Sequence, residues 1–162
     1  MGKTTVQTAP KTQGTQDVLD RARNLLQQGK PQEALDAINS AGLATQPADN
    51  LRGVCLLRIG MVEQAGKVFH RLVFRSNAGM SPDTPPAYKI NYATSLLLAG
   101  NLPGCNTVLN EVYDRGHPGL AQLRQAVRNW KRSLPLLQRL TLLVGVQPSK
   151  PVALDFPPGV LE

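Results

Sequence analysis

Residues 22–34 read ARNLLQQGKPQEA, residues 53–65 read GVCLLRIGMVEQA, and residues 93–105 read ATSLLLAGNLPGC. All three stretches follow one pattern: a small residue, a leucine three positions later, a glycine four positions after that, and a second small residue five positions further on. The chain therefore carries an internal repeat, and this repeat decides the fold.

The pattern predicts an antiparallel pair of helices in each copy. The two small residues allow the helices of a pair to approach closely, and the glycine supplies the backbone freedom that ends the first helix. Four positions after the second small residue, Ile38, Phe69 and Leu109 come at helical spacing. These three side chains are expected to point into the core.

The third copy comes late in the sequence. Gly100 follows Gly60 by 40 residues, whereas Gly60 follows Gly29 by 31, so an insertion lies between the second and third copies, within residues 75–86. Its prolines and glycine exclude a continuous helix and predict a surface loop. The alternative is that this loop recognises a partner.

The repeated pattern resembles the tetratricopeptide repeat, a helix pair of about 34 residues. The resemblance covers residues 16–115 and implies an all-α fold, in which three helix hairpins form a short right-handed solenoid with a C-terminal capping helix and an extended tail. The third copy departs from the family pattern at Pro103 and Cys105. Both residues are compatible with the pattern, because proline fits a first helical turn and cysteine is small and apolar.

Three segments are expected along the chain. Residues 1–15 are rich in Thr, Gln and Lys, lack apolar periodicity and are predicted to be a disordered tail. Residues 16–145 form the tetratricopeptide-like helical domain. Residues 146–162 are rich in proline and are predicted to be extended.

The stretch 120–133 is predicted to be the capping helix, and the helix is expected to resume beyond Pro135. A stack of repeats leaves an open apolar end, which a terminal helix with a polar outer face covers. The apolar side of this amphipathic helix comprises Leu120, Leu123, Val127, Trp130 and Leu134.

The chain has a net charge of +7, and its excess of basic residues lies toward the C-terminus. Residues 115–154 contain seven Lys or Arg and no Asp or Glu. A basic patch is expected on the capping helix at Arg124, Arg128, Lys131 and Arg132. This patch has three possible roles: a solvated outer face, a surface for an acidic protein partner, or a binder of nucleic acid or anionic membrane.

No catalytic, cofactor or metal site is predicted. His70 and His117 have no accompanying nucleophile arrangement, and the scattered histidines and cysteines lack the close spacing of zinc ligands. The protein is therefore not expected to be an enzyme. Cys55 and Cys105 are expected to be buried, reduced thiols, with a disulfide as the alternative. Without an apolar run of membrane-spanning length or a secretory signal, the protein is expected to be cytoplasmic.

The resemblance implies a concave surface, lined by the first helix of each repeat, that binds a protein or peptide partner. The alternatives are that the same residues are core, or that the C-terminal tail fills the groove. By helical spacing the groove residues are Leu19, Arg23, Leu26, Asn50, Val54, Leu57, Arg58, Ile90, Thr94 and Leu97.

The chain is also similar in size, repeat number and aliphatic groove to the type III secretion translocator chaperones, although that family tends to be acidic. This likeness implies a small adaptor, scaffold or chaperone. The lysines and asparagines of the carboxylate-clamp tetratricopeptide proteins have only a scattered echo here, at Arg23, Asn50, Arg58 and Asn91. A terminal carboxylate is therefore not the expected ligand.

Overall fold

A computed structural model describes residues 10–74, 79–143 and 152–161, and these residues form helices without a β-strand. The predicted all-α class is confirmed. The helices are α1 (Pro10–Gln27), α2 (Pro31–Ser40), α3 (Gln46–Ile59), α4 (Val62–Val73), α5 (Pro86–Leu98), α6 (Leu102–Asn110), α7 (Pro118–Ser133) and α8 (Leu136–Leu143).

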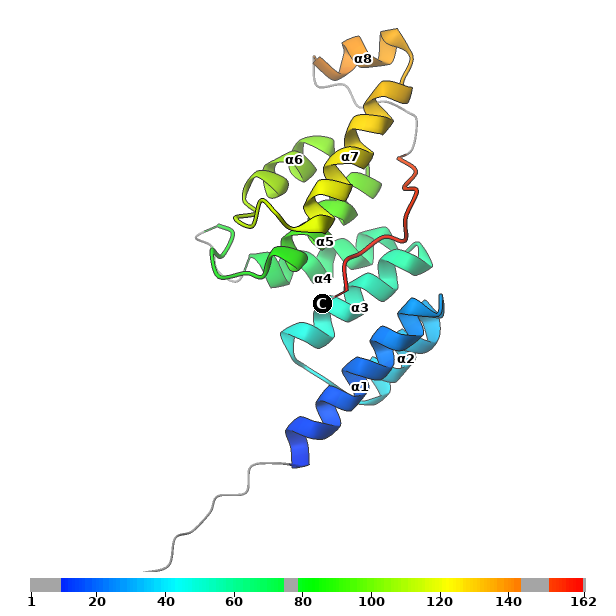
Figure 1. The fold of residues 1–162 in the computed structure, drawn as a ribbon, viewed down its shortest axis with the longest axis vertical. Coiled ribbons are helices and arrows are strands. Elements are labelled where there is room, and N and C mark those ends of the chain that lie inside the picture. The colour runs from blue at the N-terminus through cyan, green and yellow to red at the C-terminus, as the bar shows by residue number, and fades with distance from the viewer. Residues whose placement is uncertain (1–9, 75–78, 144–151, 162) are drawn as a thin grey trace, which may run out of the picture.

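The helices pack in the order in which they occur in the sequence (Figure 1). From α1 to α6, each helix contacts the next, and α1 also contacts α3, α3 contacts α5, and α5 contacts α7. The odd-numbered helices therefore lie in one row. Their apolar side chains join two core clusters, one built from α1 to α5 and one from α5 to α7, and Tyr92 packs against both.

The same turn closes each of the three predicted hairpins. Gly29, Gly60 and Gly100 have φ values of 74°, 89° and 81°, in the left-handed region that glycine adopts without strain. In each turn the residue after the glycine donates its backbone N–H to the carbonyl of the residue four before the glycine, at 2.8 to 2.9 Å. This is the hydrogen bond of a Schellman C-cap, so the predicted role of the glycines is confirmed.

The small residues of the pattern lie where two helices of a hairpin meet. Ala22, Ala34, Ala65, Ala93 and Cys105 are inaccessible to solvent. Gly53 of α3 faces the buried ring of Phe69 on α4, and a Cβ atom at Gly53 would lie 2.5 Å from two ring carbons. The absence of a side chain at residue 53 therefore lets Phe69 fill the space between these helices.

The predicted cap is α7. All five of its expected apolar residues, from Leu120 to Leu134, are buried in the second core cluster together with α5 and α6. The helix starts at Pro118, two residues before the predicted start, and it ends at Ser133 and is followed by α8, as the sequence predicts. Helix α8 projects from the end of the molecule (Figure 1) and exposes Leu136, Leu137 and Leu140.

Helix α1 begins earlier than the sequence predicts. Residues 10–15, which the sequence assigned to a disordered tail, belong to α1, because Pro10 fits a first helical position and the polar residues after it propagate the helix without any apolar signal. Residues 1–9 lie outside the described part. Within the insertion, residues 79–85 are not helical, as expected.

The two thiols are free and buried, so the expectation of reduced cysteines at Cys55 and Cys105 is confirmed. None of the described helices combines the length and the apolar character needed to cross a bilayer.

Residues 152–161, called here the tail segment, are not helical, bend at 155–156 and at 158–159, and lie across the row of odd-numbered helices, passing α7 and ending near α3 (Figure 1). Their exposure alternates along the chain. Val152, Leu154 and Phe156 are half-buried and pack against the second core cluster, whereas Ala153, Asp155 and Pro157 are exposed. One side of residues 152–156 therefore lies against the helices and the other faces solvent.

Candidate functional site

The end of the tail segment is held by the side-chain amide of Asn91 on α5. Asn91 Oδ1 accepts from the backbone N–H of Val160 at 2.6 Å, and Asn91 Nδ2 donates to the carbonyl of Val160 at 3.1 Å. Asn91 Nδ2 also donates to Asn50 Oδ1 at 3.0 Å, which fixes the orientation of the amide. One buried amide thus satisfies both backbone groups of one residue, as a neighbouring β-strand would.

Arg58, at the end of α3, binds the two residues before Val160. Its Nε atom donates to the carbonyl of Pro158 at 3.1 Å and a terminal nitrogen donates to that of Gly159 at 3.3 Å. The other terminal nitrogen donates to the carbonyl of Leu26 on α1 at 2.8 Å. Burial lowers the pKa of Arg58, while the Cys55 thiol acts in the opposite direction. The Arg58 guanidinium thus donates hydrogen bonds to three carbonyl oxygens, two in the tail segment and one on α1.

Two glycines make the approach possible. Gly159 has a φ of 91°, and a Cβ atom there would lie 2.8 Å from Val54 Cγ1 on α3. On the other side of the segment, a Cβ atom at Gly119 in the first turn of α7 would lie 2.6 Å from Val160 Cγ2. The last residues of the tail segment therefore fit between α3 and α7 because both glycines lack a side chain.

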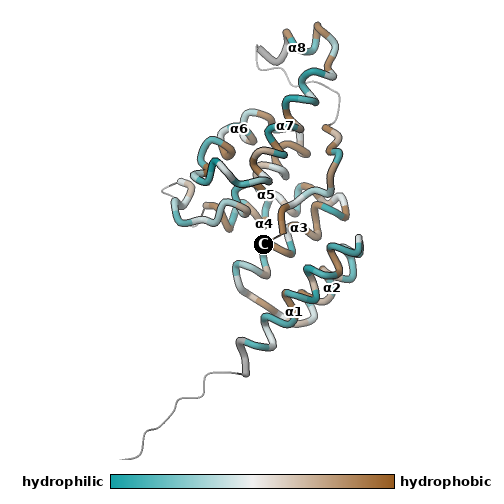
Figure 2. The backbone as a smooth tube through the Cα atoms, viewed as in Figure 1, coloured by the Kyte–Doolittle hydropathy of each residue, from teal (hydrophilic) through white to brown (hydrophobic). Residues whose placement is uncertain are grey.

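We define the tail site as Leu26, Val54, Arg58, Asn91 and Gly119, which come from four odd-numbered helices. Val160 packs against both core clusters and Leu161 against the first. Figure 2 shows apolar stretches of the tail segment beside apolar stretches of the helices. The tail site thus combines hydrogen bonds with apolar contacts. These contacts agree with the alternative, raised from the sequence, that the C-terminal tail occupies the predicted groove.

A cavity of about 430 Å³ lies beside the tail segment, at the turn between α1 and α2. Leu26 and Arg58 of the tail site line it, as do Pro158 and Leu161. The cavity therefore lies between the tail segment and the turn that joins α1 to α2.

The predicted groove residues separate into two groups. Leu26, Val54 and Arg58 belong to the tail site, and Asn50 supports it through Asn91. The other predicted groove residues have no hydrogen bond or steric contact with the tail segment among those described above, and their place in a groove stays a prediction. Leu19, Leu57, Ile90, Thr94 and Leu97 are buried in the helical core, and Arg23 pairs with Asp20 on the outside of α1.

Sequence reasoning missed Gly119 and Gly159 and gave Asn91 no structural role. A glycine after two prolines, at 157–159, is the one signal that the tail segment contains a defined turn. Gly119 follows Pro118 at the start of a helix and has the appearance of an ordinary turn residue.

The basic patch does not converge on a site. Arg124 donates to the carbonyl of Leu109 at 3.4 Å, and Arg128 donates to Gln125 Oε1 at 2.6 and 3.2 Å. Arg132 is exposed and Lys131 is half-buried. These side chains lie along α7, and two of them are engaged by neighbouring groups of the chain itself.

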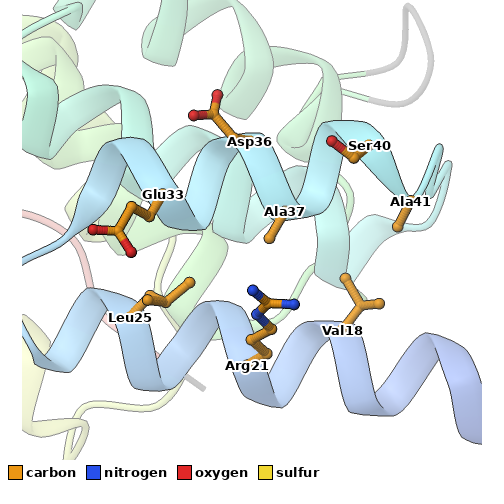
Figure 3. A pocket seen from close by; sticks show the side chains of 8 residues that line it. All are labelled: Val18, Arg21, Leu25, Glu33, Asp36, Ala37, Ser40 and Ala41. Atoms are coloured by element: carbon orange, nitrogen blue, oxygen red, sulfur yellow. The ribbon is translucent and has the colours of Figure 1, made fainter.

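A second depression, of about 550 Å³, lies between α1 and α2 (Figure 3). Arg21 rises from α1 toward α2, Glu33 extends from α2 toward Leu25 of α1, and Asp36 points away from α1. Val18, Leu25 and Ala37 supply the apolar part of the lining.

The histidines have structural contacts. His70 stacks on Phe74, with ring centroids 4.6 Å apart, and meets Tyr92 edge-on. His117 Nδ1 accepts from the N–H of Gly119 at 3.1 Å and caps α7. Within residues 10–74, 79–143 and 152–161, no three His, Cys, Asp or Glu side chains form a group that could hold a metal ion.

Comparison of the chain with protein-family models, with curated proteins and with solved structures gave no match.

Proposed function

We propose that the protein is a non-catalytic protein-protein interaction module of tetratricopeptide type. Its three hairpins and the capping helix form a short right-handed solenoid, and the groove along the odd-numbered helices binds an extended segment of a partner protein. A small adaptor and a small chaperone both fit this proposal, because either would hold such a segment.

The repeated turn supports the architectural part of the proposal. Each of the three hairpins has the same type of glycine turn and its own pair of small residues, as the units of a repeat protein have. Such units stack side by side. The contacts from α1 to α3, from α3 to α5 and from α5 to α7 agree with stacking of this kind.

The single observation that carries the functional part is the pair of hydrogen bonds between Asn91 and Val160. Recognition of a peptide requires side chains that form hydrogen bonds with its backbone, and Asn91 forms such bonds. Arg58 adds hydrogen bonds to two further carbonyls. The surface is thus suited to extended chains, and the tail segment is one such chain.

The alternative of a basic surface that binds nucleic acid or anionic membrane has weaker support. Arg124 and Arg128 already bond to Leu109 and Gln125. Such binding would weaken steeply with salt, so titration of the protein with duplex DNA or anionic vesicles at increasing salt tests it directly.

The peptide-binding proposal is tested with the full chain carrying Val160→Asp, which places a carboxylate against apolar neighbours and detaches the end of the tail segment. Random peptides displayed on phage are selected on this variant, and the selected peptides are synthesised and titrated by calorimetry. We expect dissociation constants on the order of micromolar. Adding Asn91→Leu is expected to weaken binding at least about tenfold.

The matched control is Arg128→Ala in place of Asn91→Leu, because Arg128 lies on the exposed side of α7. It should leave peptide binding unchanged. If the selected peptides bind equally well with Leu at residue 91, or if a helical Val160→Asp chain selects none, the proposed function is wrong.

A further inference from the structure

We infer that the tail segment is an intramolecular competitor and that the partner it excludes presents the same chemistry: an extended segment in which a glycine precedes two aliphatic residues. This inference rests on the proposed function and specifies its ligand. It follows from which atoms of the tail segment the helices contact.

The polar contacts read only the backbone. Arg58 binds the carbonyls of residues 158 and 159, and Asn91 binds the N–H and the carbonyl of residue 160. These contacts require a chain that follows the same backbone path but no particular side chain. Any partner segment with this backbone path can therefore replace the tail segment without a loss of hydrogen bonds.

The sequence requirement comes from the glycine position. At residue 159 the backbone has a φ of 91°, and a Cβ atom would lie 2.8 to 3.2 Å from the Val54 side chain. Both the conformation and the space favour glycine there. A partner is therefore expected to carry glycine where the backbone passes Val54.

The next position requires a compact aliphatic side chain. Val160 Cγ2 occupies the space beside Gly119 of α7, and the side chain of Val160 packs against both core clusters. Leu161 follows and packs against the first cluster, beside the cavity of about 430 Å³. That cavity flanks Pro157, Pro158 and Leu161, so a partner segment with larger side chains at these positions would have room in it.

The two ligands exclude each other, since both need the same atoms of Arg58 and Asn91. A covalently linked segment competes with an effective concentration on the order of millimolar, so a free peptide binds appreciably only after the tail segment is weakened. Access to the groove is thus controlled by the tail segment.

The experiment uses the full chain and a fluorescein-labelled, amidated peptide with the sequence of residues 152–161. Gly159→Val in the protein is expected to release the tail segment, since a β-branched residue disfavours positive φ and would collide with Val54. Asp155→Asn is the control, because Asp155 is exposed. Fluorescence anisotropy measures binding, and hydrogen exchange of residues 152–161 measures release.

We expect the peptide to bind the Gly159→Val chain at least about tenfold more tightly than the wild-type and Asp155→Asn chains. A second peptide, with valine in place of its glycine, should bind the Gly159→Val chain at least about tenfold more weakly than the first. Val160→Asp provides a second released chain if Gly159→Val lowers helicity.

Equal affinity for the two peptides would overturn the glycine requirement, and equal binding to released and wild-type chains would overturn the competition. Failure of the peptide to bind either released chain, with release shown by exchange, would also overturn the inference. In each case, phage-selected peptides that still bind in an Asn91-dependent manner would leave the proposed function standing. Loss of both kinds of binding would remove the proposed function as well.

Discussion

Gly53 on α3 packs so closely against the ring of Phe69 on α4 that no side chain fits between them. A Cβ atom at Gly53 would lie 2.5 Å from two ring carbons, and Phe69 is fully buried. Glycine in the middle of a helix is unfavourable by itself, so here packing overrides helix propensity.

Gly53→Ala is therefore expected to lower the free energy of unfolding by about 1–2 kcal/mol, because overpacking costs about 1–3 kcal/mol and the gain in helix propensity is at most about 1 kcal/mol. Urea denaturation followed by circular dichroism measures the change. Gly14→Ala on α1 is the matched control, since the added methyl group would meet nothing within 4 Å apart from its chain neighbours and the backbone of its own helix. It should stabilise the protein; destabilisation of similar size by both substitutions would contradict the packing explanation.

Asn91→Leu should free the end of the tail segment. The substitution removes both partners of Val160 and the donor to Asn50, and unsatisfied buried polar groups cost about 1–3 kcal/mol each. The expected result is fast hydrogen exchange at the Val160 amide, with α1 to α4 still protected. Asn129→Leu on the exposed side of α7 is the control and should leave that amide slow. A protected Val160 amide in Asn91→Leu would show that the tail segment is held by other contacts.

Gly119→Ala tests the steric contact from the opposite side. The added methyl group would lie 2.6 Å from Val160 Cγ2, so Val160 must move away and the tail segment should become more sensitive to proteolysis. Val160→Ala removes that methyl group. The two substitutions together should therefore destabilise the protein by less than the sum of their separate effects, with a coupling of about 0.5–2 kcal/mol. Strict additivity would rule out the contact.

The two cysteines should make the protein less stable in alkali. Burial raises the pKa of Cys55 and of Cys105 from 9.0 to about 12. Above pH 9 the unfolded chain loses these thiol protons while the folded chain keeps them, so the free energy of unfolding falls as the pH rises from about 9 to 12. Denaturation midpoints across this range measure the slope.

The matched variant replaces both cysteines by alanine. It should be less stable at neutral pH, since it leaves small cavities, but its midpoint should depend less on pH between 9 and 12. In the native wild-type protein both thiols should also resist a disulfide reagent at pH 8 and react on unfolding. An unchanged alkaline slope would show that other groups cause it.

The hairpins could be predicted from the sequence because their determinants are local. The turn at Gly60 depends on residues within five positions of it, and the spacing from Gly60 to Ala65 places the next helix. The start of α1 at Pro10 was missed because the helix there is polar on all sides and carries no periodic signal.

The site was less predictable, for two physical reasons. Helical spacing identifies residues such as Leu57 and Leu97 as apolar, but it does not distinguish a side chain that faces the groove from one that faces the next helix. The contact between Asn91 and Val160 joins residues far apart in the sequence through backbone atoms, which every residue has. The type of a residue therefore does not predict such a contact.

The position of the tail segment also sets an order of events during synthesis. The ribosome makes the helices that border the tail site before it makes residues 152–161, and it adds about 5–20 residues per second. Helical hairpins form much faster than that. A nascent chain therefore passes through an interval on the order of seconds in which Arg58 and Asn91 are already in position but have no intramolecular ligand. In that interval the groups that later hold the tail segment are exposed to other molecules, and they are covered only once residues 152–161 have been made.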